Sequence, residues 1–498
     1  MATADAPVME VNILTLNCWG IPFVSQEYSS RLAEIGRHIA KADPTPHIVG
    51  LQECFFKKDF EHICQETRHF LPYTKHYSAG PFGTGLAILS RWPIENSSMI
   101  QYPLNGHPTA FYHGDWYIGK GVACATIRYG KEIDDVIDVF NTHMHASYSI
   151  KNDYLCHRVG QAWEFAKLLQ AASQRRHGRA LVIGLGDLNT EPNSLPWRIL
   201  KHFAVNVYDT WLESPLQHKA LPETGEQDGN VRNKVSGIQD GATYGSPYNT
   251  WQWTRAQRAQ YLSGQPNSPT CELMLPPEIN QSQAIRIDYV LASVASQMPH
   301  TTSPKTRDEN GIHNTSIAHQ DSGWVVLATK VGMLDRHPVL GCSLSDHFSV
   351  EVTLAFQNKS AGNSADADFS LNLLSGPRHV ATSRNLHVKK DDEMVLEEVL
   401  RVLGDYELAR QQRNRWEKIR LGAAGVVLIG SLAGVWVVER VGWARLLLGI
   451  TGALALTFAV AGGYGGLLFN CAETAALQEL TWEVSNMKQR VTNDHGHD

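Results

Sequence analysis

Several polar residues stand directly after apolar, strand-like runs, where they could take part in chemistry. In VIGLGDLNTEP, residues 182–192, Asp187 and Asn189 follow such a run. Residues i and i+2 of a strand point to the same face, so these two side chains are expected to project together. A carboxylate at such a place costs free energy unless it is paired or ligates a metal. Taken alone, the pattern is equally typical of a polar strand end that leads into a turn.

Other strand-like runs carry polar residues at the same kind of position. Asn17 closes VNILTLN, Glu53 closes HIVGLQE, His143 closes DVFNTH, Asp288 lies within RIDYVL, and Asp346 and His347 precede the alternating run FSVEVTLAF. In α/β sheets, ligands gather at strand ends, where loops bring distant residues together. This repetition favours one shared site over a set of unrelated polar edges.

The elements that must position these residues alternate between short β-branched runs and helical patterns from Val11 to about Phe356. Helices are predicted at 29–42, 58–70 and 153–174. The alternation predicts α/β layers around substantial sheets. Residues 221–277 are rich in Gly, Pro, Asn and Gln, which predicts a long loop or insertion.

Composition narrows the class of protein. The 498 residues carry a formal net charge of −6, which is unlike the basic footprint of a nucleic-acid binder. The eight cysteines show no CxxC pair and no regular spacing, which argues against a zinc site or a disulfide framework and favours a reducing compartment. The N-terminus lacks a basic start followed by an apolar stretch, so no secretory signal is predicted.

After the globular domain, the chain changes character. The predicted division is a domain at 9–357, a polar linker at 358–391, an amphipathic helix with a basic end at 392–420, a two-helix transmembrane hairpin at 421–470, and a C-terminal helix and tail at 471–498. The two apolar runs of the hairpin carry no charge, and each is long enough to cross about 30 Å of hydrocarbon. A hydrophobic hairpin buried in a soluble domain is the alternative.

The topology of this hairpin follows from its short loop, ERVGWAR, which keeps both outer ends on one side of the membrane. Basic residues at 410–420 assign that side to the cytosol by the positive-inside tendency. The sequence therefore predicts an integral membrane protein with a cytosolic globular domain. The same basic run is expected to engage anionic lipid, unless it serves only to set topology.

Two apolar seams flank the hairpin at helical spacing. They consist of Leu396, Val399, Leu403 and Tyr406 before it, and of Leu477, Leu480, Val484, Met487 and Val491 after it. We expect them to pair as an antiparallel stalk, either within one chain or between two chains in a homodimer. The alternative is that each helix lies flat on the membrane.

The ordered motifs LNCWG, QE, NTH, GDLN, RIDYV and SDH resemble the endonuclease/exonuclease/phosphatase superfamily, also called deoxyribonuclease-I-like. Within it, LNCWGIP, HGDWYIGKG, NTHMHA, HRVGQAWEFA and the hairpin are similar to the group of neutral sphingomyelinases and fungal inositol phosphosphingolipid phospholipases C. The resemblance covers nearly the whole chain. It implies a four-layered α/β sandwich, in which two packed β-sheets are flanked by helices.

The resemblance also implies roles for the polar set. Glu53 would be the principal ligand of Mg²⁺, with Asn17 beside it and Mn²⁺ as a substitute ion. His347 would be the general base, Asp288 would orient it, and Asp346 would lie next to it near the metal. Histidine titrates near neutral pH, which suits a base.

The remaining candidates would act on the phosphate. Asp187 would position the attacking water or the leaving oxygen, Asn189 would donate to a phosphoryl oxygen, and His143 would hydrogen-bond a non-bridging oxygen. His157 matches a histidine tied to activity in this group. The role of His145 is left open, and it would share a face with His143 only if the strand continues.

The implied function is a membrane-anchored phospholipase C that hydrolyses inositol phosphosphingolipid, sphingomyelin or both to ceramide and a phosphorylated head group. Anionic phospholipids are expected as activators, and nucleic acid is not expected as a partner. The endoplasmic reticulum and the mitochondrial membrane are both open as locations. The alternatives are a nuclease or other phosphoesterase on the same fold, and an inactive lipid-binding membrane scaffold.

Overall fold

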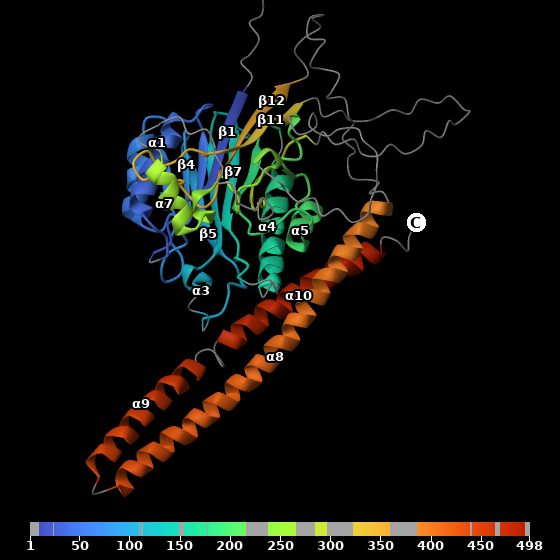
Figure 1. Cartoon of the computed structure of the whole chain (residues 1–498). Coiled ribbons are helices and arrows are strands. Elements are labelled where there is room, and N and C mark those ends of the chain that lie inside the picture. The colour runs from blue at the N-terminus through green and yellow to red at the C-terminus, as the bar shows by residue number, and fades with distance from the viewer. Residues whose placement is uncertain are drawn as a thin grey trace, which may run out of the picture. The chain divides into compact units, whose positions relative to one another are not determined.

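The computed structural model describes most of the chain and divides it into two units (Figure 1). The described residues are 9–22, 24–108, 110, 113–148, 154–176, 178–215, 238–264, 284–295, 322–358, 386–438, 441–463 and 469–493. The first unit comprises Met1–Gln101, Lys120–Met144 and Ala162–Arg384, and the second comprises Tyr102–Gly119, His145–Gln161 and Asn385–Asp498. Much of the predicted polar linker, residues 359–385, lies outside the described residues.

The first unit contains a six-stranded sheet in the order β11-β12-β1-β2-β4-β3. Its strands are β1 (Met9–Asn17), β2 (Ile48–Gln52), β3 (Tyr73–His76), β4 (Ala87–Ser90), β11 (Ser322–Gly332) and β12 (Ser349–Asn358). β1 and β2 are parallel, and the other neighbours are antiparallel.

A second six-stranded sheet has the order β5-β6-β7-β8-β10-β9. Its strands are β5 (Ile94–Gln101), β6 (Gly121–Arg128), β7 (Val136–His143), β8 (Leu181–Asp187), β9 (Tyr208–Asp209) and β10 (Asp288–Ala292). Only β7 and β8 are parallel among these described pairings.

The two sheets pack face to face over one apolar core. Ile13 and Ile88 of the first sheet share this core with Val139 and Ile183 of the second. The approach is close enough at Gly50 that an added Cβ would meet the Leu185 side chain at 2.2 Å. Branched side chains on the facing surfaces therefore interdigitate, and a residue without a side chain is needed where the sheets come nearest.

Helices cover both outer faces of this pair of sheets. α1 (Tyr28–Lys41) and α2 (Lys57–Thr67) pack on the first sheet in a core that includes Leu14, Ile35 and Ile63. On the second sheet, Gly184 of β8 faces Leu169 of α4 (Leu155–Arg175), and α5 (Leu195–Phe203) follows β8 along the chain. The result is the four-layered α/β sandwich that was predicted.

Some elements were not predicted from the sequence. β5 has the polar sequence IENSSMIQ and lies at a sheet edge, where few of its side chains are buried, so it carries little apolar signal. Within the predicted loop at 221–277, the described residues 238–264 contain two short 3₁₀ turns, Ile238–Asp240 and Thr250–Gln252, and the helix α7 (Arg255–Gly264). The rest of that predicted loop lies outside the described residues.

The second unit contains α8 (Leu386–Val437), α9 (Gly442–Gly463), α10 (Asn470–Asn493), the short helix α3 (Asp115–Ile118) and the start of α4. The predicted amphipathic helix and first span form one continuous helix, α8, which begins before residue 392. No Gly-Pro signal separates the basic segment from the apolar run, so the change in composition near residue 420 does not end the helix.

The two predicted seams pair within one chain. α8 and α10 are antiparallel, because Lys488 contacts Glu397 at 2.8 Å whereas the Tyr406 hydroxyl donates to Glu473 at 2.6 Å. The buried seam residues are Leu396, Val399, Leu403, Leu477, Leu480, Val484 and Val491. This pairing is the intrachain form of the predicted stalk.

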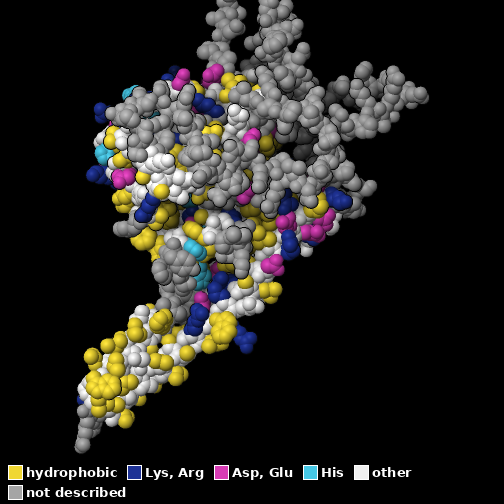
Figure 2. Space-filling model, viewed as in Figure 1, with side chains coloured by type: hydrophobic (Ala, Val, Ile, Leu, Met, Phe, Trp, Pro, Cys, Tyr) yellow, Lys and Arg dark blue, Asp and Glu magenta, His cyan; other side chains and the backbone are white. Residues whose placement is uncertain are grey.

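Two helices are long and apolar enough to cross a membrane. Within the part of the chain that the structure describes, these segments are Lys390–Val437 of α8 and Gly442–Val460 of α9, and few residues of their apolar windows are buried. Figure 2 shows hydrophobic side chains gathered over the outer ends of α8 and α9. The core helix of a soluble domain would instead be mostly buried, so the exposure favours membrane association.

Candidate active site

The strand topology of the first unit brings most of the predicted polar residues together. Asn17 ends β1, and Glu53 follows β2 directly. In the second sheet, the β7–β8 register pairs His143 with Asp187, and the β8–β10 register pairs Asp187 with Asp288. Because these strand ends lie at the same end of each sheet, residues far apart in sequence converge on one site.

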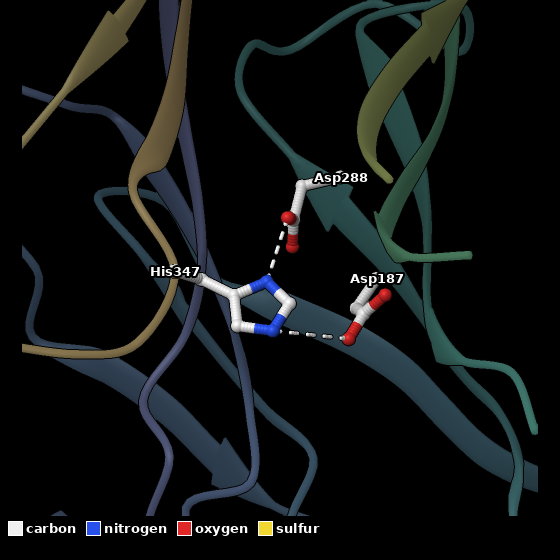
Figure 3. A group of neighbouring side chains, drawn as sticks. All are labelled: Asp187, Asp288 and His347. Carbon is white, nitrogen blue, oxygen red and sulfur yellow. Dashed lines mark hydrogen bonds and ion pairs between the residues drawn. The ribbon is translucent and has the colours of Figure 1, made fainter. Parts of the chain in front are cut away.

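His347 and Asp288 form the central contact of the site (Figure 3). The Nδ1 atom of His347 lies 2.8 Å from Asp288 Oδ2, and its Nε2 atom lies 3.8 Å from Asp187 Oδ2. Burial of the imidazole lowers the pKa of His347, but the carboxylates of Asp288, Asp187 and Asp346 outweigh it and hold this pKa well above the ordinary value. A proton received by this imidazole is therefore stabilised.

Asn17 connects the two sheets through its side-chain amide. Its Nδ2 group donates to Glu53 Oε1 at 3.1 Å and to Asp187 Oδ2 at 2.9 Å. The Asn17 carbonyl accepts a hydrogen bond of 2.6 Å from Ser345 Oγ, and the same oxygen of Ser345 accepts from the backbone N–H of His347 at 3.2 Å. These bonds fix the His347 loop to the end of β1.

Glu53 occupies a strained and buried position. Its backbone is left-handed, with φ of 53°, a region that costs a non-glycine residue free energy and is often found at functional sites. Burial, followed by the charge of Asp346, raises the pKa of Glu53 to about 8. Burial and the charge of Asp288 likewise raise the pKa of Asp187 to about 6. Burial and the neighbouring carboxyl groups thus disfavour ionisation of both side chains.

The donor set fits a divalent cation. Ligand atoms of Asp187, Asp288 and His347 lie within 4.8 Å of one another. Among the described residues, buried Glu53 Oε2 and Asp288 Oδ1 have no hydrogen-bond partner. Carboxylate oxygens left in this state are the hard ligands that Mg²⁺ and Mn²⁺ take.

His143 and Asn189 lie around the Asp187 carboxylate. His143 Nε2 is 3.5 Å from Asp187 Oδ2 and 3.8 Å from Glu53 Oε1. The Asn189 backbone N–H donates to Asp187 Oδ1 at 2.9 Å, and its side chain donates to the Met144 carbonyl at 3.1 Å. β8 ends at Asp187 and Asn189 has φ of 46°, so the strand alternation that predicted a common face does not extend to Asn189.

Asp346 flanks His347 at a longer distance. Its Oδ1 atom lies 4.0 Å from His347 Nε2, and burial raises the pKa of the Asp346 carboxyl. It is the most exposed of the carboxylates around His347.

His145 and His157 belong to the second unit, and none of the contacts described above involves them. β7 ends at His143, so the strand does not continue to His145 as a common face would require. His145 Nε2 lies 3.5 Å from Asp115, and the His157 ring packs at 5.3 Å from the ring of Tyr406 in α8. A role of His157 in turnover remains a prediction.

Two buried cations of the first unit were missed from the sequence. Arg31 of α1 donates to the carbonyls of Trp19 at 2.8 Å and Leu344 at 2.7 Å, which ties the loop after β1 to the His347 loop. Lys120 donates to the Met144 carbonyl at 2.8 Å. The sequence does contain a signal that Arg31 is buried, because this charged residue falls on the same stripe of α1 as the buried apolar side chains.

Comparison with known proteins identifies the fold and the class of chemistry. The "Endonuclease/Exonuclease/phosphatase family" matches residues 14–347. The chain is 35% identical to "Inositol phosphosphingolipids phospholipase C" of Schizosaccharomyces pombe, over 72% of this chain and 70% of that protein. It is 27% identical to the Saccharomyces cerevisiae protein of the same name, over 98% and 92%. It is 32% identical to human "Sphingomyelin phosphodiesterase 2", over 41% and 47%.

Proposed function

The chain belongs to the endonuclease/exonuclease/phosphatase family, and we propose that it is a phospholipase C-type enzyme acting on a membrane sphingolipid. It would hydrolyse the phosphodiester to leave ceramide and a phosphorylated head group. The observation that carries this proposal is the buried Asp288–His347 contact beside Asp187. It has the geometry of an oriented general base next to a phosphate-binding edge.

In the proposed reaction, His347 Nε2 takes a proton from the attacking water, while Asp288 holds Nδ1 and stabilises the imidazolium. Asp187 orients the water, and His143 and the Asn189 amide hydrogen-bond the phosphoryl oxygens. Positioning and charge stabilisation are the main requirements of phosphoryl transfer.

Glu53 and Asn17 would hold Mg²⁺, which when bound supplies positive charge for the phosphoryl oxygens. The unsatisfied Glu53 Oε2 supports this assignment, whereas Asp288 is already engaged by His347. Binding of Mn²⁺, followed by its electron paramagnetic resonance, tests the assignment. Glu53→Gln should lose the ion and Asp288→Asn should retain it; the reverse result would assign the cation to the cluster of Asp187, Asp288 and His347.

We propose that α8 and α9 form a membrane hairpin. Trp416 and Trp436 of α8 are 61% and 85% exposed and stand 20 residues apart, about 30 Å along one continuous helix. This spacing matches the two interfaces of a bilayer, where tryptophan is enriched. Exposed Arg415, Lys418 and Arg420 cluster at the Trp416 end, which supports a cytosolic side there and contact with anionic lipid.

Inositol phosphosphingolipid is the first candidate substrate, because similarity to the yeast protein of that name extends over 98% of the chain. Sphingomyelin is the second candidate, through the shorter match to the human protein. The net charge of −6 disfavours DNA. The membrane of residence is proposed to be that of the endoplasmic reticulum or the mitochondrion.

The test uses the full chain in mixed micelles, with Mg²⁺ or a chelator. Inositol phosphosphingolipid, sphingomyelin and a DNA duplex are compared, with His347→Asn as the inactive variant and Ile133→Ser as a matched surface control. Chelator-sensitive release of ceramide is expected. Cleavage of DNA without ceramide release would contradict the proposal in favour of a nuclease.

A further inference from the structure

Three loops of the first unit lie at the end of the first sheet where the proposed catalytic residues are found. They are residues 18–27 after β1, of which 23 lies outside the described residues, 53–56 after β2, and 77–86 between β3 and β4. β1 and β2 are parallel, and β4 is antiparallel to both β2 and β3, so all three loops emerge beside Asn17 and Glu53. We call them the rim loops.

Backbone hydrogen bonds tie the rim loops to one another. The N–H of Gly20 donates to the Glu53 carbonyl at 3.0 Å, and the N–H of Cys54 donates to the Gly85 carbonyl at 2.8 Å. The His76 ring adds a contact of 2.7 Å between its Nε2 atom and the Cys54 carbonyl. The rim loops therefore form one connected surface around Glu53.

This surface has an unusual composition for a protein exterior. The charged residues of the rim loops are Glu27, which is exposed, and Glu53, which is buried in the site, and Lys57 and Lys58 follow Phe56 as the first two residues of α2. Large apolar side chains are nevertheless exposed on each loop: Val24 at 63%, Phe56 at 37% and Phe82 at 67%. Apolar side chains gathered at the edge of a site mark an interaction surface rather than ordinary solvent exposure.

We propose that the rim loops dock on an anionic phospholipid bilayer, with Val24, Phe56 and Phe82 inserted at the boundary between head groups and acyl chains. This inference rests on the proposed function. The scissile phosphate of a sphingolipid lies at head-group level. The rim of a site that binds this phosphate must therefore meet the membrane surface. Interfacial binding of this kind combines buried apolar area with attraction of lysines to anionic lipid.

Charge identifies the bilayer as the occupant. Lys57 and Lys58 are exposed beside Phe56, which places cationic groups next to an apolar anchor. Lys57 lies 3.7 Å from Glu61, but such an exposed pair is weak, and it leaves the ammonium available to a lipid phosphate. An anionic lipid surface matches the placement of these two exposed cations beside the apolar side chains of the loops.

The test measures where the rim lies when the full chain is reconstituted in vesicles. An environment-sensitive dye is attached at Phe82→Cys in a Cys471→Ser background, with the background chain labelled as the blank. Ile133→Cys is the matched control, because Ile133 is 83% exposed in the turn between β6 and β7, at the opposite end of that sheet from His143. Vesicles with and without phosphatidylserine are compared, and an aqueous quencher reports exposure.

We expect the dye at Phe82 to be at least fivefold less quenched in phosphatidylserine vesicles than in detergent, and the dye at Ile133 to be unchanged. Equal quenching at both positions, in a chain that still hydrolyses bilayer substrate, would overturn the inference. Protection at Phe82 that grows with protein concentration in detergent would also overturn it, since a second copy would then cover the rim.

A second measurement uses turnover. The double variant Phe56→Ser/Phe82→Ser should lower the ratio of activity on bilayer substrate to activity on a water-soluble short-chain analogue by about fivefold, whereas Ile133→Ser should leave this ratio unchanged. A ratio unchanged in the double variant counts against docking. Because dye protection needs no turnover, protection at Phe82 in a chain inactive on every sphingolipid would support the surface while refuting the proposed substrate.

Discussion

The raised pKa of Glu53 would link the binding of the proposed cation to pH. A carboxylate must lose its proton before it ligates a metal, so protons compete with Mg²⁺ below the pKa of about 8. At pH 6.5 only about 3% of such a group is ionised, and at pH 9 about 90%. For release of one proton, the apparent affinity for Mg²⁺ should therefore rise about 30-fold over this interval, or about 2 kcal/mol.

Stability without the cation should change in the opposite direction. The folded chain keeps on Glu53 a proton that the unfolded chain releases above the ordinary pKa of 4.5, so the folded state binds more protons between pH 4.5 and 8. The contribution of Glu53 to the free energy of unfolding is then lost as the pH rises through about 8. Mg²⁺ should consequently raise Tm more at pH 9 than at pH 6.5.

Isothermal titration with Mg²⁺ and thermal unfolding across this pH range provide the assay. His347→Asn is the matched control, because it removes the imidazole, another group of raised pKa, and should keep the Glu53 dependence. Glu53→Gln should abolish both the affinity and its slope. An affinity that is flat between pH 6.5 and 9, or a slope that survives in Glu53→Gln, would refute the reasoning.

Further variants test the other roles. His347→Asn should lower kcat by about 10²- to 10⁴-fold with the fold intact, which circular dichroism and a rate assay check together. Asn189→Ala should lower kcat more than it raises KM, because its contact strengthens as phosphoryl charge builds. Arg31→Met should lower Tm and kcat, since it leaves the carbonyls of two loops unsatisfied; an unchanged kcat would leave Arg31 a purely structural role. Glu473→Gln should destabilise the α8–α10 pair by about 1–2 kcal/mol in detergent unfolding, because Tyr406 and Arg413 lose a charged acceptor.

Patterns with a strong local signal predicted their elements well. The buried strands β1 and β8 and the amphipathic helix α1 lie within a few residues of the predicted ranges. Their buried faces require apolar residues at regular spacing, which is visible in the sequence. The seams of α8 and α10 could be predicted for the same reason. β5 could not, because an exposed edge strand needs no apolar alternation.

The site could be predicted as a set of residues but not as a set of contacts. Polar residues at strand ends identified Asn17 and Asp187, which are 170 positions apart and yet hydrogen-bonded. Arg31 meets the carbonyl of Leu344 across 313 positions, a partnership that no local pattern encodes. Every residue has a main-chain carbonyl, so the sequence does not show which carbonyl an arginine will bind. Such hydrogen bonds can be identified only from the structure.

The origin of the site in both sheets explains why its geometry is sensitive to packing far from the chemistry. Glu53 and His347 come from the first sheet, and Asp187 and Asp288 from the second. The sheets are held in register by direct contacts. The Gln52 amide donates to Asn141 Oδ1 at 2.7 Å, and Asn141 Nδ2 donates to the carbonyls of Leu51 and Ala87.

Gln52 lies one residue before Glu53 and Asn141 two residues before His143, so these bonds join the two sheets close to the site. A shift between the sheets would break them and would separate the Asn17 amide from either Glu53 or Asp187. Buried polar contacts of this kind are costly to break, so they hold the two halves of the site at fixed distance. Repulsion among the ionised carboxylates then acts on a rigid frame, and the proposed cation would relieve it without moving the groups apart.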